Sequence, residues 1–386
     1  MLFKDIIGHQ DIKDRLVKSV HENRISHAQL FLGAEGSGAL QLAIAYAQYI
    51  CCKNKADNDS CGKCPSCIKY NKLIHPDLHF VFPVVTKKNY PMPDGSSKDL
   101  VMSGDYMFLF RQAFIDNPHQ NLNQWLAFVD AENKQGIIAV DESSELIRKL
   151  NLKTYESDYK IAIIWMPEKM RTEAANHLLK IIEEPPDKTL FILVAENSDQ
   201  IINTILSRTQ LIKINKPADE ELIAAIMEKY SYKKDQAAYI VHLADGNQND
   251  IQSLAHPDAD DDSTAELLKW WRLCYGYQSA KEIGGLINWV EGQAKIGREK
   301  QKGFLLYAMH IFRECILLQY AGAANVRMSA EELTAFTKFA PMINENNCHQ
   351  FVEELNKAYF HIERNANPKI LFLDLSFKLG RLLRNN

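Results

Sequence analysis

The 386-residue sequence predicts an α/β domain, in which helices cover both faces of a parallel sheet, followed by a region built only of helices. The first half of the chain alternates short, fully apolar runs of strand length with segments of helical pattern, which is typical of a parallel sheet buried on both faces. From residue 265 to residue 383 the apolar residues recur at helical spacing instead. Strands are expected at 28–32, 160–165, 189–195 and 209–214, and helices at 39–50, 169–183 and 201–207.

A glycine-rich loop, residues 33–40 with the sequence GAEGSGAL, lies between the first predicted strand and its helix. Strand, glycine loop and helix form the setting of a phosphate-binding loop, where backbone N–H groups surround phosphates, a Lys contacts them and a Ser or Thr holds Mg²⁺. An ordinary glycine-rich turn is the simpler alternative. The glycines are retained and both functional side chains are replaced: Gly33, Gly36, Gly38, Ala39 in the Lys position and Leu40 in the Ser/Thr position. No ATP binding is therefore expected.

Five of the eight cysteines lie between residues 51 and 67. In a reducing compartment such a cluster indicates a metal site rather than disulfides. Four thiolates suit a structural Zn²⁺ ion, which needs no open coordination position. The predicted ligands are Cys52, Cys61, Cys64 and Cys67, and Cys51 could replace Cys52. An iron–sulfur cluster and a nucleic-acid-binding zinc finger are the competing interpretations, which the spacing and the shortage of aromatic residues disfavour.

Composition limits the class of protein. A hydrophobic content of 46% and a net charge of −4 fit a globular protein that is not coated in nucleic-acid-binding charge. No apolar run reaches the roughly 18 residues that span a bilayer, and the N-terminus lacks the apolar region of a secretory signal. A cytoplasmic protein without membrane contact is therefore expected.

Three domains are predicted. Residues 1–215 form the α/β core with a zinc module at about 51–67, residues 216–257 a three-helix lid, and residues 263–386 a helical domain. Within the core, 83–130 has the character of an insertion. A loop is expected at 87–103 and helices at 106–115 and 122–129, while 136–140 could pair as a short strand or lead into a helix at 141–152.

Two segments carry a resemblance to a known family. Residues 176–186 read NHLLKIIEEPP, and residues 205–209 read ILSRT. With IIGHQ at 6–10 and SHA at 26–28, they closely resemble the clamp-loader branch of the AAA+ proteins, which includes subunits of bacterial DNA polymerase III. The resemblance covers the whole chain except 83–130. It implies a AAA+ core with an inserted zinc module, a helical lid and a C-terminal collar that joins subunits into a ring.

The resemblance also implies where catalytic residues would stand. An active member carries Asp-Glu at positions that fall here on Trp165 and Met166, neither of which can hold Mg²⁺ or polarise water. Glu168 lies nearby but is displaced. The lid of an active member offers an Arg just after a Gly, whereas residues 246–250 read GNQND. Together with the altered glycine loop, these losses predict a subunit with no ATPase activity of its own.

One charged element of the family pattern is retained. Arg208 stands in Ser-Arg-Thr, where the family has Ser-Arg-Cys. In the family this Arg acts in trans as an arginine finger, which stabilises charge on the γ-phosphate bound by the neighbouring subunit. Taken alone, Arg208 would be an ordinary exposed side chain near a strand. On the preceding helix, Lys180 has the spacing to pair with Glu183 or Glu184.

The resemblance therefore implies a non-catalytic clamp-loader subunit. Its implied partners are the ATP-binding gamma/tau subunits, the clamp-opening delta subunit and, through the assembled complex, the sliding clamp and primed DNA. Two other classes stay open: an ATP-binding gamma-type loader ATPase, and a zinc-dependent nucleic-acid-binding protein outside any ring. The first would need a Lys at position 39 and acidic residues at 165 and 166, which the sequence lacks.

Overall fold

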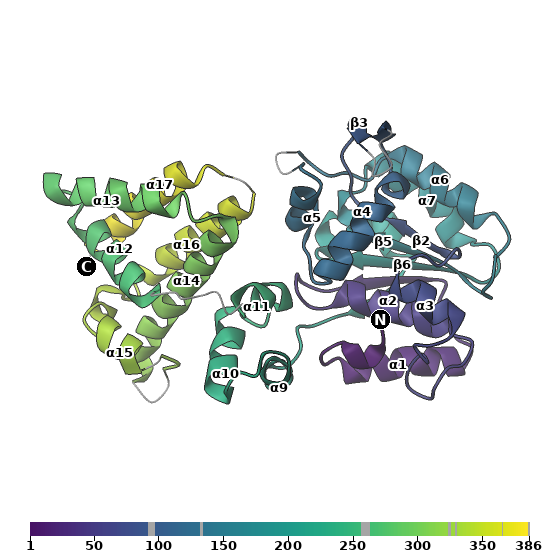
Figure 1. Cartoon of the computed structure of the whole chain (residues 1–386), viewed down its shortest axis with the longest axis horizontal. Helices are drawn as coiled ribbons and strands as arrows, with labels where there is room; N and C mark the ends of the chain where they lie inside the picture. The colour runs from purple at the N-terminus through teal and green to yellow at the C-terminus, as the bar shows by residue number, and fades with distance from the viewer. Residues whose placement is uncertain are drawn as a thin grey trace. The chain divides into compact units, whose positions relative to one another are not determined.

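The computed structural model describes residues 1–91, 97–131, 134–255, 263–322, 326–328, 330–364 and 366–384. The chain forms two compact units (Figure 1). The first comprises Met1–Ala225 with Gly246–Asn249, and the second comprises Ile226–Asp245 with Asp250–Asn386. The finer division into core, lid and collar stays a prediction.

A five-stranded parallel sheet forms the centre of the first unit, in the strand order β2-β5-β6-β1-β7. This confirms the parallel α/β sheet that the apolar runs predict. A further strand at the outer edge, β2, has no counterpart among the expected strands. The strands are β1 (Ala28–Leu32), β2 (Leu78–Val81), β5 (Lys160–Trp165), β6 (Thr189–Ala195) and β7 (Gln210–Lys213).

Helices cover both faces of the sheet because successive strand residues point to opposite sides. In β5, Ile161 and Ile163 pack into a core with α2 (Ala39–Cys51), whereas Ala162 and Ile164 pack into a second core with α6 and α7. Figure 1 shows these two layers. The helices of this unit are α1 (Gln10–His21), α2, α3 (Pro65–Asn71), α4 (Ser103–Asp116), α5 (Leu122–Phe128), α6 (Val140–Leu150), α7 (Thr172–Glu183) and α8 (Asn203–Leu206).

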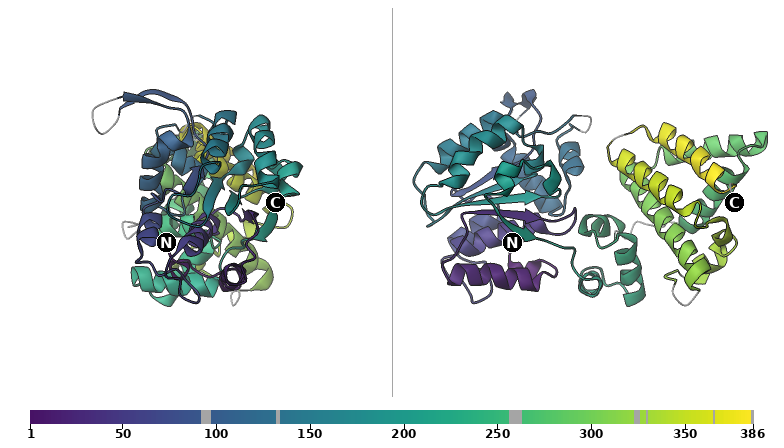
Figure 2. Two further views of the ribbon diagram at one scale, coloured as in Figure 1. Left: turned by 90° about the vertical axis from the view of Figure 1, so that its right-hand side faces the viewer. Right: turned by 180° about the vertical axis from the view of Figure 1, so that it is seen from behind.

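The expected loop at 87–103 is wrong, because this segment contains an antiparallel hairpin of β3 (Lys87–Pro91) and β4 (Ser97–Leu100). The backbone N–H of Asn89 donates to the Asp99 carboxylate at 2.8 Å, and Leu100 is buried in the core. The hairpin projects from the first unit (Figure 2), so its strands are mostly polar and show no apolar alternation. Residues 92–96, which supply most of the turn-like composition, lie outside the described residues.

Three other expected segments can be compared with the structure. The helix expected from 169 begins at Thr172, because Pro167–Lys169 form a separate 3₁₀ turn. In the segment 136–140, Ile137 and Ile138 make isolated β-bridges and the helix α6 follows at Val140. The two helices expected within 83–130 are present as α4 and α5.

The second unit is helical throughout its described residues, which confirms the helical C-terminal region. Its core contains the stacked rings of Trp270 and Trp289, whose centroids are 5.2 Å apart. The chain enters it through α9 (Asp219–Tyr230). The helices that follow are α10 (Lys234–Leu243), α11 (Gln248–Leu254), α12 (Ser263–Gly276), α13 (Ala280–Gln293), α14 (Arg298–Ala321), α15 (Ala330–Phe336), α16 (Cys348–Glu363) and α17 (Pro368–Leu382).

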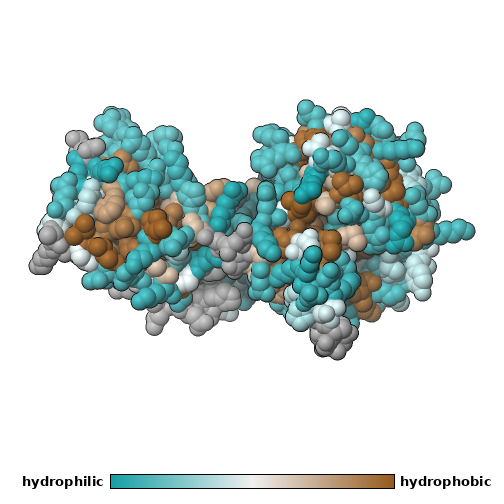
Figure 3. All heavy atoms as spheres, turned by 90° about the horizontal axis from the view of Figure 1, so that it is seen from above, coloured by the Kyte–Doolittle hydropathy of each residue, from teal (hydrophilic) through white to brown (hydrophobic). Residues whose placement is uncertain are grey.

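Hydrophilic side chains cover much of the face of each unit that is seen in Figure 3, with apolar side chains in smaller groups between them. None of the helices in the described part of the chain is long and apolar enough to cross a membrane.

Candidate functional site

The glycine loop lies at the carboxyl edge of the parallel sheet, where open α/β sheets place their ligands. It follows β1, and the N–H of Gly33 donates to the carbonyl of Ala195 at the end of β6 at 3.0 Å. Gly36 and Gly38 have φ values of 71° and 90°, a left-handed conformation that favours glycine. Gly38 is the N-cap of α2. The loop thus leads from a parallel strand into the N-terminus of a helix, which is the setting of a phosphate-binding loop.

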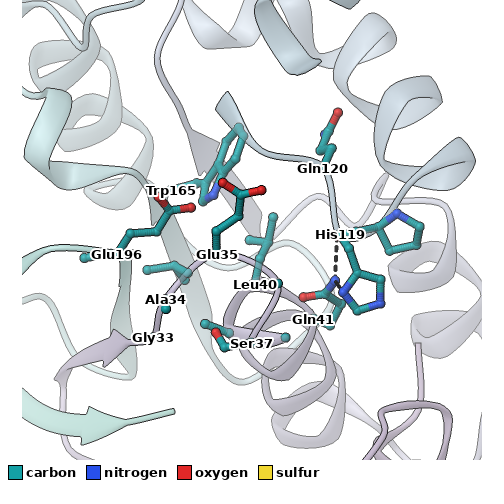
Figure 4. A pocket seen from close by; sticks show the side chains of 16 residues that line it. Gly33, Ala34, Glu35, Ser37, Leu40, Gln41, His119, Gln120, Trp165 and Glu196 are labelled. Atoms are coloured by element: carbon teal, nitrogen blue, oxygen red, sulfur yellow. Dashed lines mark hydrogen bonds between the residues drawn. The ribbon is translucent and has the colours of Figure 1, made fainter. Parts of the chain in front are cut away.

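The pocket above this loop is too small for a nucleotide. Its volume is about 40 Å³, which is room for only a few water molecules. Small-molecule sites usually measure about 300 Å³ or more. Leu40, Trp165 and Glu35 extend into the space from different sides (Figure 4). Trp165 is only 4% exposed and packs against Phe110, with 5.8 Å between the ring centroids.

The charge of the pocket is also wrong for phosphate. Two carboxylate side chains, Glu35 and Glu196, line it, and none of the described residues in the lining is Lys or Arg. A triphosphate placed here would meet negative charge, which repels it. The small volume and the negative charge of the pocket therefore both disfavour nucleotide binding.

Glu35 is held by two side chains from distant parts of the chain. Its Oε1 accepts hydrogen bonds from the amides of Asn121 at 3.0 Å and Asn249 at 3.1 Å. Asn117 in turn donates to Asn249 at 3.1 Å. The glycine loop is thereby tied to the insertion and to the GNQND segment, in which the family pattern would place a sensor Arg.

Two further groups of hydrogen bonds hold the glycine loop and the start of α2 against neighbouring segments. The backbone N–H and the side-chain amide of Gln248 both donate to the carbonyl of Gly36, at 3.3 and 3.1 Å. On the other side, the side-chain amide of Gln41 lies 2.6 Å from the carbonyl of Pro118 and 2.8 Å from Nδ1 of His119. The insertion thus lies against the glycine loop and forms part of the pocket lining.

The expected positions for catalytic acids hold buried apolar residues. Trp165 ends β5, and Met166 follows it with φ of 59°. The carboxylate of Glu168 accepts a hydrogen bond from the N–H of Glu196 at 2.9 Å, and burial raises its pKa. Glu168 therefore fixes the backbone after β6 and is not among the residues that line the pocket.

The structure brings four cysteines together in a geometry that fits zinc. The Sγ atoms of Cys52, Cys61, Cys64 and Cys67 lie within 4.8 Å of one another. The separations between these sulfurs include 3.6 Å (Cys52–Cys61), 4.0 Å (Cys52–Cys64) and 3.9 Å (Cys61–Cys67). A tetrahedral ion with Zn–S bonds of about 2.3 Å would place its sulfurs about 3.8 Å apart.

Backbone amides support this cluster. The N–H groups of Cys61, Cys64 and Cys67 donate to the sulfurs of Cys52, Cys61 and Cys64 at 3.3, 3.3 and 3.5 Å. Such donors stabilise the negative charge of thiolates and orient the ligands. Four sulfurs with supporting amides and no open position form a candidate structural metal centre.

Cys51 does not join this group. Its Sγ accepts a hydrogen bond from the hydroxyl of Tyr70 at 3.2 Å, and burial raises its pKa to about 11. His75 is not a ligand either. Its Nδ1 accepts the N–H of Asp77 at 3.2 Å, so Nε2 carries the proton and lies 3.2 Å from a carboxylate oxygen of Glu156.

Arg208 follows α8 and is held by its own chain. Its Nε donates to the carboxylate of Glu183, and its Nη1 donates to the carbonyl of Thr204 at 2.8 Å and to Oγ of Ser207 at 3.3 Å. The side chain is 34% exposed. Its predicted role in trans stays a prediction.

The individual residues of the site were thus predictable, whereas their partners were not. The four thiolates and the substituted glycine loop lie where the sequence places them. Glu35, Asn121 and Asn249 were missed, because no motif marks a lone Glu or Asn. The insertion over the loop was missed as well, and its only sequence signal was the absence of any family counterpart for 83–130.

Comparison with known proteins gives a consistent result. A family model described as DNA polymerase III, delta subunit, matches residues 8–218. The DNA polymerase III subunit tau of Bacillus subtilis (strain 168) is 22% identical over 393 residues, which is 96% of this chain and 60% of that protein. The delta prime subunits of Bacillus subtilis (strain 168) and Escherichia coli (strain K12) are 25% and 22% identical over 67% and 64% of this chain. The chain covers 63% and 59% of their lengths.

Proposed function

The chain belongs to the DNA polymerase III delta-subunit family, which includes delta prime clamp-loader subunits, and we propose that it is a delta prime-type subunit without a nucleotide of its own. In this role it joins ATP-binding gamma/tau subunits and a delta subunit in the ring that loads the sliding clamp on primed DNA. Arg208 serves a neighbour's ATP site as an arginine finger. The cytoplasm stays the expected compartment.

The observation that carries this proposal is the small pocket above the glycine loop. The family backbone is present, but about 40 Å³ remain in it and two carboxylates line it. A subunit that cannot take ATP contributes to such a ring only through its surfaces. A fixed core suits a reference against which ATP-binding subunits move.

The main competitor is a gamma-type loader ATPase, because a tau subunit aligns with 96% of this chain. Ala39 and Leu40 speak against it, since neither can neutralise a phosphate or hold a metal. Trp165 speaks against it more strongly, because a buried indole ring lines the pocket where an active member would need a carboxylate. These features favour the delta prime role over the motor role.

The four cysteines would hold Zn²⁺ through their thiolates. Zinc has no redox role, and a closed four-sulfur site supplies folding energy rather than chemistry. We propose that the ion holds residues 52–67 against α2, the helix that begins at the glycine loop.

Reconstitution with the gamma/tau and delta subunits of the same organism tests the function. Arg208→Ala is expected to leave assembly intact and to slow ATP turnover, by about 10³-fold or more at the site that it serves. The purified chain alone is expected to bind neither ATP nor primed DNA. Unchanged turnover with Arg208→Ala, or micromolar ATP binding with turnover by the chain alone, would refute the proposal.

A further inference from the structure

The ion pair between Glu183 and Arg208 lies at the meeting point of two family segments. Glu183 is the last residue of α7, within the NHLLKIIEEPP stretch, and Arg208 lies two residues beyond the end of α8. From this pair we infer that Glu183 is the positioning residue for Arg208, fixing its guanidinium in the orientation that meets a neighbour's phosphate. The inference rests on the proposed function of Arg208.

The hydrogen bonds within the chain use Nε and Nη1 of the guanidinium and leave Nη2 available. Nε donates to Glu183, and the two hydrogens of Nη1 are directed at Thr204 and Ser207. Among the described residues, Nη2 has no hydrogen-bond partner. A guanidinium carries five N–H donors in a planar fork, so three are used inside the chain and two remain for an incoming oxygen.

The location of Glu183 is not explained by the stability of its own helix. A carboxylate at the carboxyl end of a helix meets the negative end of the helix dipole, which disfavours it. The guanidinium of Arg208 offsets this repulsion. The pair is also exposed, with 45% and 34% of the two side chains accessible, and ion pairs this exposed contribute little to folding.

Positioning matters because a long Arg side chain loses much rotamer freedom when it is fixed on a phosphate. If Glu183 and the carbonyl of Thr204 already hold it, less freedom remains to be lost when charge develops in the transition state. Preorganised donors of this kind act on the rate of the chemical step rather than on substrate binding. Removal of Glu183 is therefore expected to lower kcat and to leave KM unchanged.

The test is a mutant cycle in the reconstituted loader complex. The Arg208-dependent turnover is defined as the difference in ATP turnover between the wild-type and Arg208→Ala complexes. Glu183→Ala is expected to lower it by about tenfold with unchanged KM for ATP, whereas Glu183→Gln, whose amide oxygen can still accept from Nε, retains it within about twofold. Glu184→Ala, which removes a carboxylate at the neighbouring position, is the matched control and keeps the wild-type rate.

The double variant Glu183→Ala/Arg208→Ala distinguishes positioning from any other role. It is expected to be no slower than Arg208→Ala alone, because a positioning residue has nothing to do once its target is gone. An additional loss in the double variant would overturn the inference, as would a rate for Glu183→Ala equal to or above wild type while Arg208→Ala is slow. Unchanged turnover in Arg208→Ala would instead refute the proposed function, and this inference with it.

Discussion

The carboxylate of Glu35 in the glycine loop accepts a hydrogen bond of 3.1 Å from the side chain of Asn249, 214 residues further along the chain. Asn121 donates to the same oxygen at 3.0 Å. Where a nucleotide-binding relative would hold phosphates against a cation, this chain joins three of its own segments through uncharged amides and one carboxylate. The loss of Lys and Ser/Thr at positions 39 and 40 is therefore only part of the change, since side chains from two distant segments also bind the glycine loop.

Restoring the two lost side chains alone is expected not to restore nucleotide binding. In the variant Ala39→Lys/Leu40→Thr the pocket still contains the ring of Trp165 and the carboxylate of Glu35. Calorimetric titration with Mg·ATP should show no binding below about 1 mM, which corresponds to less than about 4 kcal/mol of binding free energy. The same variant with Glu35→Ala added tests the contribution of the carboxylate. A micromolar Kd for the first variant would show that the pocket opens readily.

Removal of the metal is expected to unfold the zinc module. Cys64→Ala leaves three thiolates and should abolish the one zinc ion per chain measured by atomic emission, with a clear fall in Tm. Cys51→Ala is the matched control, because Cys51 bonds to Tyr70 and lies outside the four-sulfur group. It should keep the zinc ion. Equal metal loss in the two variants, or protein that is purified without any zinc, would contradict the assignment.

The residues that the sequence made predictable are those whose signal is local. Apolar runs such as 160–165 and 189–195 predict strands because every residue in them is buried. The cysteine spacing predicts the metal centre because a loop of that length can bring its sulfurs to one ion. Glu183 shows the limit of such local signals. Helical spacing offers Lys180 as its partner, but the structure pairs it with Arg208, 25 residues away.

The parts that could not be predicted depend on contacts across the sheet edge. Asn121 lies 86 residues from Glu35, and its type alone gives no indication of a partner. The strand β2 has the sequence Leu-His-Phe-Val and is only four residues long, too short for a periodicity to emerge. The β3–β4 hairpin is polar on its exposed sides. For Asn121 and β2 the stabilising partner comes from a distant segment, Glu35 and β5 respectively, so tertiary structure decides where sequence pattern does not.

Acid is expected to destabilise the junction between the zinc module and β2. Burial lowers the pKa of His75. Burial of Asp77 by itself would raise its pKa, but the N–H groups of Glu156, Tyr155 and Ser157 outweigh it and lower that pKa. A His with a lowered pKa loses its contribution as pH falls below about 6.5, and an Asp with a lowered pKa loses its contribution as pH falls below about 3.9.

The free energy of unfolding measured in urea should therefore fall on acidification, first below about pH 6.5 and again below about pH 4. Asp77→Asn should cost about 1.5–3 kcal/mol at pH 7, because charge-assisted hydrogen bonds are lost. It should also flatten the lower part of the pH profile. A variant as stable as wild type at pH 7, with an unchanged profile, would show that Asp77 is solvated in both states.

Substitution of Gly36 is expected to separate the glycine loop from the GNQND segment. A Cβ at this position would lie 1.9 Å from Oδ1 of Asn247, and the φ of 71° strains any side chain. Gly36→Ala should cost about 1–3 kcal/mol and break the two hydrogen bonds from Gln248. Hydrogen exchange followed by mass spectrometry should then show faster exchange at the amide of Gln248, which donates to the carbonyl of Gly36.

Gly284→Ala is the control, because its Cβ would meet nothing within 4 Å. That helical site should gain about 0.5–1 kcal/mol. Native stability and unchanged exchange in Gly36→Ala would mean that the segment moves aside without cost, so that the glycine loop is not fixed by it.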